Sequence, residues 1–121
     1  MIQKKTVTLI AAWVALLSAG CGSSAVPVAK LSEAKSTARA AQEAGAQSSP
    51  EAALHLKMAN DALASAQQSV ADGDGDRAQL LLNQAQADAD LSLSLARGAT
   101  QKRQAQEAEA KVDNLMKQGP Q

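Results

Sequence analysis

Aromatic residues are almost absent from this chain. Trp13 is the only one among 121 residues, and it lies near the N-terminus, so the rest of the chain has no aromatic ring at all. Proteins that bind bases commonly stack them on aromatic side chains. The chain also has 12 basic and 12 acidic residues, whereas a nucleic-acid surface needs a basic patch or stripe. We therefore expect neither nucleic acid nor a stacked small molecule as a ligand.

Residues that bind metals or act as nucleophiles are equally scarce. The chain has one histidine, His55, and one cysteine, Cys21. A zinc site needs three or four nitrogen, sulfur or carboxylate ligands, so His55 is expected to be an ordinary helix residue. No Ser-His-Asp set, carboxylate pair or glycine-rich phosphate loop is evident, and the carboxylates at 88, 90, 107 and 109 are expected on solvated helix faces. We predict no catalytic residue, no cofactor and no metal, and hence no enzyme.

The alternation of Asp72, Asp74 and Asp76 resembles the start of a calcium-binding loop. Such a loop needs glycine at its sixth position and glutamate at its twelfth. Those positions hold Arg77 and Asn83 here. The run is therefore interpreted as a break between two helices.

Residues 1–20 have the three parts of a secretory signal, namely a basic start, an apolar run and small residues before a cleavage site. Lys4 and Lys5 supply the charge, Thr6 to Leu17 the apolar run, and residues 18–20 are Ser, Ala and Gly. The apolar run is shorter than the roughly 20 residues that a spanning helix needs. Removing this signal would leave 10 basic against 12 acidic residues, a formal charge of −2.

The segment Leu17-Ser18-Ala19-Gly20-Cys21 resembles a bacterial lipobox. This resemblance implies that a signal peptidase recognises residues 17–20 and that Cys21 becomes the lipidated N-terminus. Two or more acyl chains hold a protein stably on a bilayer. A plain signal peptide followed by an unrelated cysteine, or an uncleaved anchor, are the alternatives.

Gly22 follows the cysteine. In lipoprotein sorting of the enterobacterial type, aspartate at that position retains the protein at the inner membrane. By that resemblance we expect this chain on the periplasmic face of the outer membrane, joined to its folded part by a short tether over residues 21–27.

The remaining chain has the composition of a helical protein. About a quarter of it is alanine, and clusters of strand-favouring residues are lacking. Apolar residues recur at alternating spacings of three and four, which predicts helices over 28–46, 50–71 and 77–118. The stripes are Leu31, Ala34, Ala38, Ala41 and Gly45; then Ala52, Leu56, Ala59, Leu63, Ala66 and Val70; then Ala78, Leu82, Ala85, Ala89, Leu93 and Ala96.

The predicted helix boundaries carry suitable residues. Ser49 is a capping residue, and Pro50 fits the first position of a helix. Gly73 suits the left-handed end of a helix, and Asp74 or Asp76 is expected to cap the next one. The fold class is therefore all-α: an antiparallel hairpin and a long third helix, in a three-helix bundle or coiled-coil-like arrangement over residues 28–98.

The third helix is longer than the hairpin can cover. Leu80, Leu91 and Leu95 lie opposite its first stripe, which indicates burial between the other two helices or a surface for self-association. Residues 99–121 are expected to project as a helical or partly disordered arm. Its own stripe consists of Ala105, Ala108, Val112 and Leu115. If Cys21 is at the membrane, this arm points away from it.

Three blocks of sequence are familiar in their order and spacing. They are Pro27 to Ala34, Ser49 to Glu51 leading to Leu63–Ala66, and Gly73 to Ala78 leading to Gln84–Ala89. Over about residues 20–100 the chain resembles the domain-of-unknown-function 4398 family of small bacterial lipoproteins. The resemblance implies a helical hairpin with a third helix in the cell envelope, and no established activity. Some members precede a peptidoglycan-binding domain of the outer-membrane-protein-A type, for which this chain has no room, so a cell-wall role would need a partner.

These observations predict a non-enzymatic, lipid-anchored envelope protein that serves as a structural spacer or protein-interaction adaptor. Its expected partners are the membrane, through the lipid, and another protein or a second copy of itself. The alternative is a chaperone-like or ligand-binding module that uses the apolar faces of the third helix.

Overall fold

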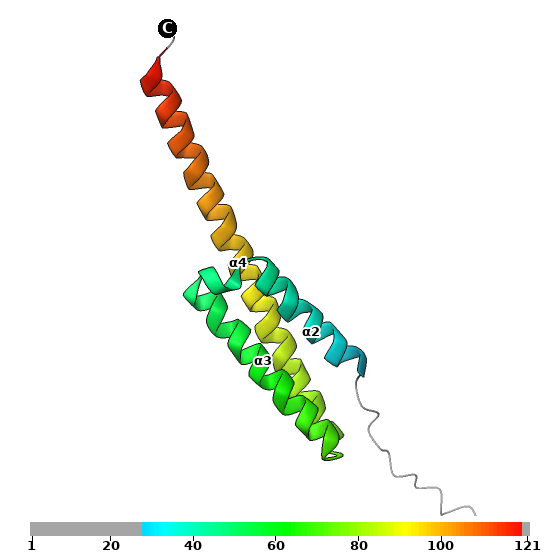
Figure 1. Cartoon of the computed structure of the whole chain (residues 1–121). Coiled ribbons are helices and arrows are strands. Elements are labelled where there is room, and N and C mark those ends of the chain that lie inside the picture. The colour runs from blue at the N-terminus through cyan, green and yellow to red at the C-terminus, as the bar shows by residue number, and fades with distance from the viewer. Residues whose placement is uncertain (1–27, 120–121) are drawn as a thin grey trace, which may run out of the picture.

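The computed structural model describes residues 28–119, and every regular element in that range is helical. The elements are α2 (Val28–Glu43), the short 3-10 helix η1 (Ala46–Ser48), α3 (Pro50–Ala71) and α4 (Gly75–Gln118). α2 and α3 run in opposite directions (Figure 1). α4 packs against both of them, antiparallel to α3 and in the same direction as α2, and continues far beyond the bundle. The predicted all-α hairpin with a long third helix is confirmed.

The core between the three helices is built almost entirely of alanine. Twelve of the fifteen buried apolar residues are alanines, and the others are Leu56, Leu63 and Leu82. A methyl side chain lets helix backbones approach closely, but it buries little apolar area. Leu31, Leu81, Leu93 and Leu95 pack around this core and are partly buried. The bundle is therefore closely packed, with a small hydrophobic contribution from each residue.

α2 ends three residues before the predicted end of the first helix. Gly45 has a φ of 87°, in the left-handed region that favours glycine. Its amide donates to the carbonyl of Gln42 at 3.0 Å. Ala46 then starts η1 and is fully buried. The prediction that Gly45 continues the helical stripe was wrong, because glycine at this position ends the helix and turns the chain toward α3.

α3 begins where the sequence predicted. Pro50 occupies its first turn, where its missing amide proton costs no hydrogen bond. Ser49 precedes it in an extended conformation, but its side chain makes no capping hydrogen bond. Ser49 thus occupies the predicted N-cap position without the expected side-chain hydrogen bond, and the proline fixes the start of α3.

The aspartate-rich connection between α3 and α4 is a tight turn. Gly73 has a φ of 77°, and the amide of Asp74 donates to the carbonyl of Ser69 at 2.9 Å. One carboxylate oxygen of Asp74 accepts from the amide of Arg77 at 3.0 Å and caps α4. α4 starts at Gly75, two residues before its predicted start. Of the two predicted capping residues, Asp74 fills the role.

α4 is the longest element, with 44 residues, or about 66 Å at 1.5 Å per residue. Buried and partly buried residues occur along it only as far as Thr100, and every residue from 101 to 119 is exposed. The start of α2 and the α3–α4 turn lie at one end of the molecule, and the end of α4 lies at the other (Figure 1). Among residues 28–119, no helix has the length and apolar character required to cross a bilayer.

Candidate functional site: the interfaces and free surface of α4

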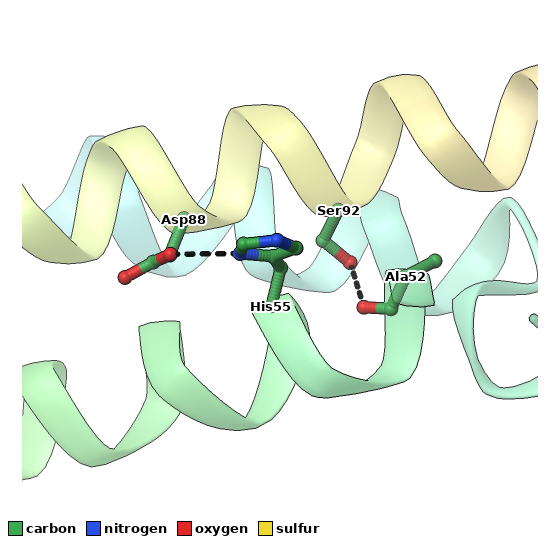
Figure 2. A network of polar contacts seen from close by, with 4 residues as sticks. All are labelled: Ala52, His55, Asp88 and Ser92. Atoms are coloured by element: carbon green, nitrogen blue, oxygen red, sulfur yellow. Dashed lines mark hydrogen bonds and ion pairs between the residues drawn. The ribbon is translucent and has the colours of Figure 1, made fainter. Parts of the chain in front are cut away.

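A histidine and an aspartate join α3 to α4. Nδ1 of His55 on α3 lies 3.0 Å from Oδ1 of Asp88 on α4 (Figure 2). The two side chains are only 22% and 13% exposed. Asp88 was predicted on a solvated face, and that prediction was wrong, because its carboxylate points into the interface. His55 is thus the α3 side of a polar contact between helices.

Ser92 makes a second polar contact one turn further along α4. It is fully buried, and its hydroxyl donates to the carbonyl of Ala52 on α3 at 2.7 Å (Figure 2). The sequence pattern placed Leu93 on the buried stripe, whereas Ser92 is buried and Leu93 only partly so. Ser92 follows Ala85 by seven residues and precedes Ala96 by four, so the heptad spacing was the signal that could have identified it.

Asp88, His55 and Ser92 are the three residue types of a serine-hydrolase triad, but they are not arranged as one. In such a triad the serine hydroxyl is hydrogen-bonded to the imidazole and open to substrate. Here the hydroxyl of Ser92 is buried and donates to a main-chain carbonyl. The three residues instead form polar contacts that hold α3 against α4.

A different set of contacts connects α2 to α4. Nε2 of Gln86 donates to Oγ1 of Thr37 at 3.1 Å, and Nζ of Lys30 donates to Oδ1 of Asn83 at 2.8 Å. Near the far end of the bundle, the hydroxyl of Thr100 donates to the carbonyl of Ala44 at 3.3 Å. These contacts hold the first 26 residues of α4 in a fixed position, from which the rest of the helix extends.

No site with the chemistry of a metal centre is present in residues 28–119, since nowhere in that range do three or more His, Cys, Asp or Glu side chains gather. The surface hollow at the α3–α4 turn contains Asp72 and Asp74 beside Arg77. The carboxylate of Asp72 accepts from Gln68, and that of Asp74 caps α4. Both aspartates are therefore engaged within the turn.

The face of α4 that points away from the bundle carries exposed apolar residues. Leu80 is 68% exposed and Leu91 is 43% exposed. Leu95 packs against the core. Burial of all three leucines between the other helices was therefore a wrong prediction for Leu80 and Leu91. The physical reason is that α2 and α3 pack on the same half of α4 and leave its opposite half uncovered.

The arm of α4, defined as residues 101–118, continues this uncovered surface. Val112, Leu115 and Met116 are 53%, 62% and 69% exposed, and the arm extends past the bundle (Figure 1). Lys102 and Arg103 are exposed as expected, and Arg103 donates to the hydroxyl of Thr100 at 3.2 Å. The arm is thus a single helix whose apolar stripe has no partner within residues 28–119.

The predicted lipidation site lies outside the described residues. Cys21 and the recognition residues Leu17, Ser18, Ala19 and Gly20 all precede Val28, where the description of the structure begins. Their roles stay predictions from the sequence.

The chain was compared with known protein families, curated proteins and solved structures. The model of the domain of unknown function DUF4398 matches residues 29–111, which include α2, α3 and most of α4. No curated protein and no solved structure matches the chain. The match extends past the bundle into the arm, further than the predicted resemblance over residues 20–100. The chain therefore belongs to the DUF4398 family.

Proposed function

We propose that this protein is a lipid-anchored spacer or adaptor of the bacterial cell envelope, with α4 as its interaction element. The observation that carries the proposal is the arm of α4, which extends past the bundle at the end opposite to Val28 and keeps an apolar stripe exposed. A helix of this length is marginal in water by itself. Another protein that packs against the arm would bury these apolar residues and stabilise the helix.

The direction of the arm fits an anchor at Cys21. Only six residues separate Cys21 from Val28, so a lipid on the cysteine would hold the start of α2 near a bilayer. α4 would then reach away from the membrane by about the length of its 44 residues. Gly22 after the cysteine favours the periplasmic face of the outer membrane as the location.

The anchor is tested by metabolic labelling with a palmitate analogue. The wild-type chain should incorporate the label and fractionate with membranes, whereas Cys21→Ser should do neither. Ser23→Cys in the Cys21→Ser background is a matched control that restores a thiol two positions away and should not restore labelling. Equal labelling of wild type and Cys21→Ser would refute the anchor.

The adaptor role is tested by crosslinking in intact cells with and without the arm. A chain that ends after Thr100 retains every residue of α4 that is buried or partly buried, so it should remain folded and anchored. We expect it to lose the stoichiometric crosslinked species that the full chain forms. Identical crosslinking patterns for the two chains would show that the arm has no such role.

A chaperone-like binder is the second candidate, because exposed apolar side chains also occur outside the arm. Leu54 and Met58 on α3 are 55% and 38% exposed and lie one turn apart. Many weakly crosslinked clients, captured equally by the full and the shortened chain, would favour this function over that of an adaptor with one partner.

A further inference from the structure

The uncovered face of α4 has a regular seven-residue repeat along most of its length. Starting at Leu80, alternating steps of four and three residues reach Leu91, Gly98, Ala105 and finally Leu115. Every residue on this path is exposed. We call this path the outer stripe. Steps of four and three place residues along one seam of a helix, as in a coiled coil. The outer stripe spans both the bundle part of α4 and its arm, so it is one surface.

We propose that the outer stripe is a homodimer interface, in which the α4 helices of two copies pack antiparallel with the two-fold axis between Leu91 and Ser94. This inference goes beyond the proposed function by naming a second copy of the chain as the partner. It needs no lipid, so it does not depend on Cys21. An interface with two-fold symmetry must be complementary to itself, and both the side-chain sizes and the charges of the outer stripe can be checked against that requirement.

The side-chain sizes match in this register. Leu91 of one copy lies opposite Ser94 of the other, and Leu80 lies opposite Ala105. Each of the two leucines thus meets a small side chain. Ala87 lies opposite Gly98, and this pair of small residues lets the two helices approach closely. The two glutamines of the outer stripe, Gln84 and Gln101, also meet each other, where their amides can form hydrogen bonds across the interface. Large residues opposite small ones are compatible with close packing of two helices.

The charges beside the outer stripe match in the same register. The residues that precede every second position of the repeat, such as 90, 97 and 111, and 76 when the repeat is extended back to residue 77, lie on one side of the seam and face one another across an antiparallel pair. Asp90 of one copy then lies beside Arg97 of the other, and Asp76 lies beside Lys111. Symmetry doubles each pair. All four residues are exposed, and one carboxylate oxygen of Asp90 accepts from Nε2 of Gln86 at 3.1 Å, which leaves its other oxygen to face Arg97. Exposed ion pairs add little affinity, but they select orientation and register.

Other arrangements place like charges or like sizes together. Sliding one helix by seven residues brings Arg97 beside Arg97 in one direction and Asp90 beside Asp90 in the other. A parallel pair brings Arg97 beside Lys102 of the second copy and places Leu91 on Leu91 and Gly98 on Gly98. Of these arrangements, only the proposed register places both Asp90 and Arg97 beside a residue of opposite charge.

The antiparallel arrangement places the two Val28 ends at opposite ends of the dimer, because the start of α2 lies at the start of α4 (Figure 1). Lipids on both chains would lie at opposite ends of such a dimer, so the projecting arm of the proposed function belongs to a chain outside the dimer. The last turns of each arm, with Val112 and Leu115, extend past the start of the α4 helix of the second copy and remain free.

Disulfide crosslinking in the full chain tests the register. Cys21→Ser removes the native thiol, and Gln84→Cys and Gln101→Cys are each added to that background in chains of different mass. Residues 84 and 101 are 17 positions apart, or about 25 Å along the helix, so neither variant should crosslink to itself. Their mixture should give a mixed disulfide dimer on mild oxidation. Self-crosslinked dimers of each single variant would overturn the antiparallel arrangement, and monomers alone would overturn the dimer.

Charge exchange tests the same pairing by sedimentation equilibrium. Arg97→Asp should weaken self-association at least several-fold, as should Asp90→Arg, and the double variant should recover it because the pair is restored with its signs reversed. Arg103→Asp is the matched control, because residue 103 lies on the side of α4 opposite the outer stripe. An equal loss in Arg97→Asp and Arg103→Asp would overturn the proposal. Circular dichroism of each variant checks that the helices are intact.

Discussion

A few polar residues inside the bundle determine how α3 and α4 are aligned along their length. An alanine surface is uniform, so a helix on it can slide by one repeat without losing much contact. The contact of His55 with Asp88 and that of Ser92 with the carbonyl of Ala52 connect particular turns of α3 and α4. Since a buried polar group without a partner is unfavourable, these two contacts favour a single alignment.

Asp88→Ala should lower the free energy of unfolding by about 1–2 kcal/mol, because it leaves the half-buried His55 without its partner. The measurement is urea denaturation followed by circular dichroism. Asp113→Ala, on the exposed arm, is the control and should change stability by less than about 0.5 kcal/mol. In a double-mutant cycle with His55→Ala the effects should not add. Additive effects would show that the two side chains do not act as a pair.

At the scale of elements, helix boundaries were predicted most accurately where a residue type fits only one position in a helix. Pro50 fits only the first turn of a helix, and α3 begins there. Gly45 was predicted on the helical stripe but ends the helix, because apolar spacing does not distinguish a stripe position from a helix end. For Leu80 and Leu91 the sequence left burial and a self-association surface open, because their spacing does not reveal that α2 and α3 pack on the same half of α4. The pairing of His55 with Asp88 joins residues 33 positions apart, and no local pattern encodes it.

Substitution of two glycines by alanine should change the stability of the fold in opposite directions. Gly98 lies within α4, and a methyl group added there would meet nothing within 4 Å, so Gly98→Ala should stabilise the fold by about 0.5–1 kcal/mol. Gly45 has equal space, but its φ of 87° is unfavourable for alanine, so Gly45→Ala should destabilise by about 1 kcal/mol or more. Thermal unfolding of both variants, compared in the Arg97→Asp background to exclude dimer effects, checks the difference in sign. Stabilisation by both would show that the left-handed turn at Gly45 is not needed.

At the scale of the whole molecule, α4 unites two parts of different stability. Its first part is covered by α2 and α3 and shares their alanine core. Its second part, the arm, is exposed along its whole length. Membership of the DUF4398 family includes the arm as far as residue 111, so the long helix is part of the family domain rather than an addition to it.

Hydrogen exchange should therefore change abruptly along α4. A helix without tertiary contacts opens easily, whereas amides in a bundle exchange only through larger unfolding events. In the Arg97→Asp variant, measured as a monomer, amides of residues 101–118 should exchange orders of magnitude faster than those between Leu82 and Ala96. In the wild-type chain at dimer-forming concentration, protection should extend to about Lys111, where the α4 helix of the second copy begins, and should fall beyond it. Uniform protection along the whole of α4 in the monomer would mean that the arm is stable by itself, and that its exposed stripe requires no partner.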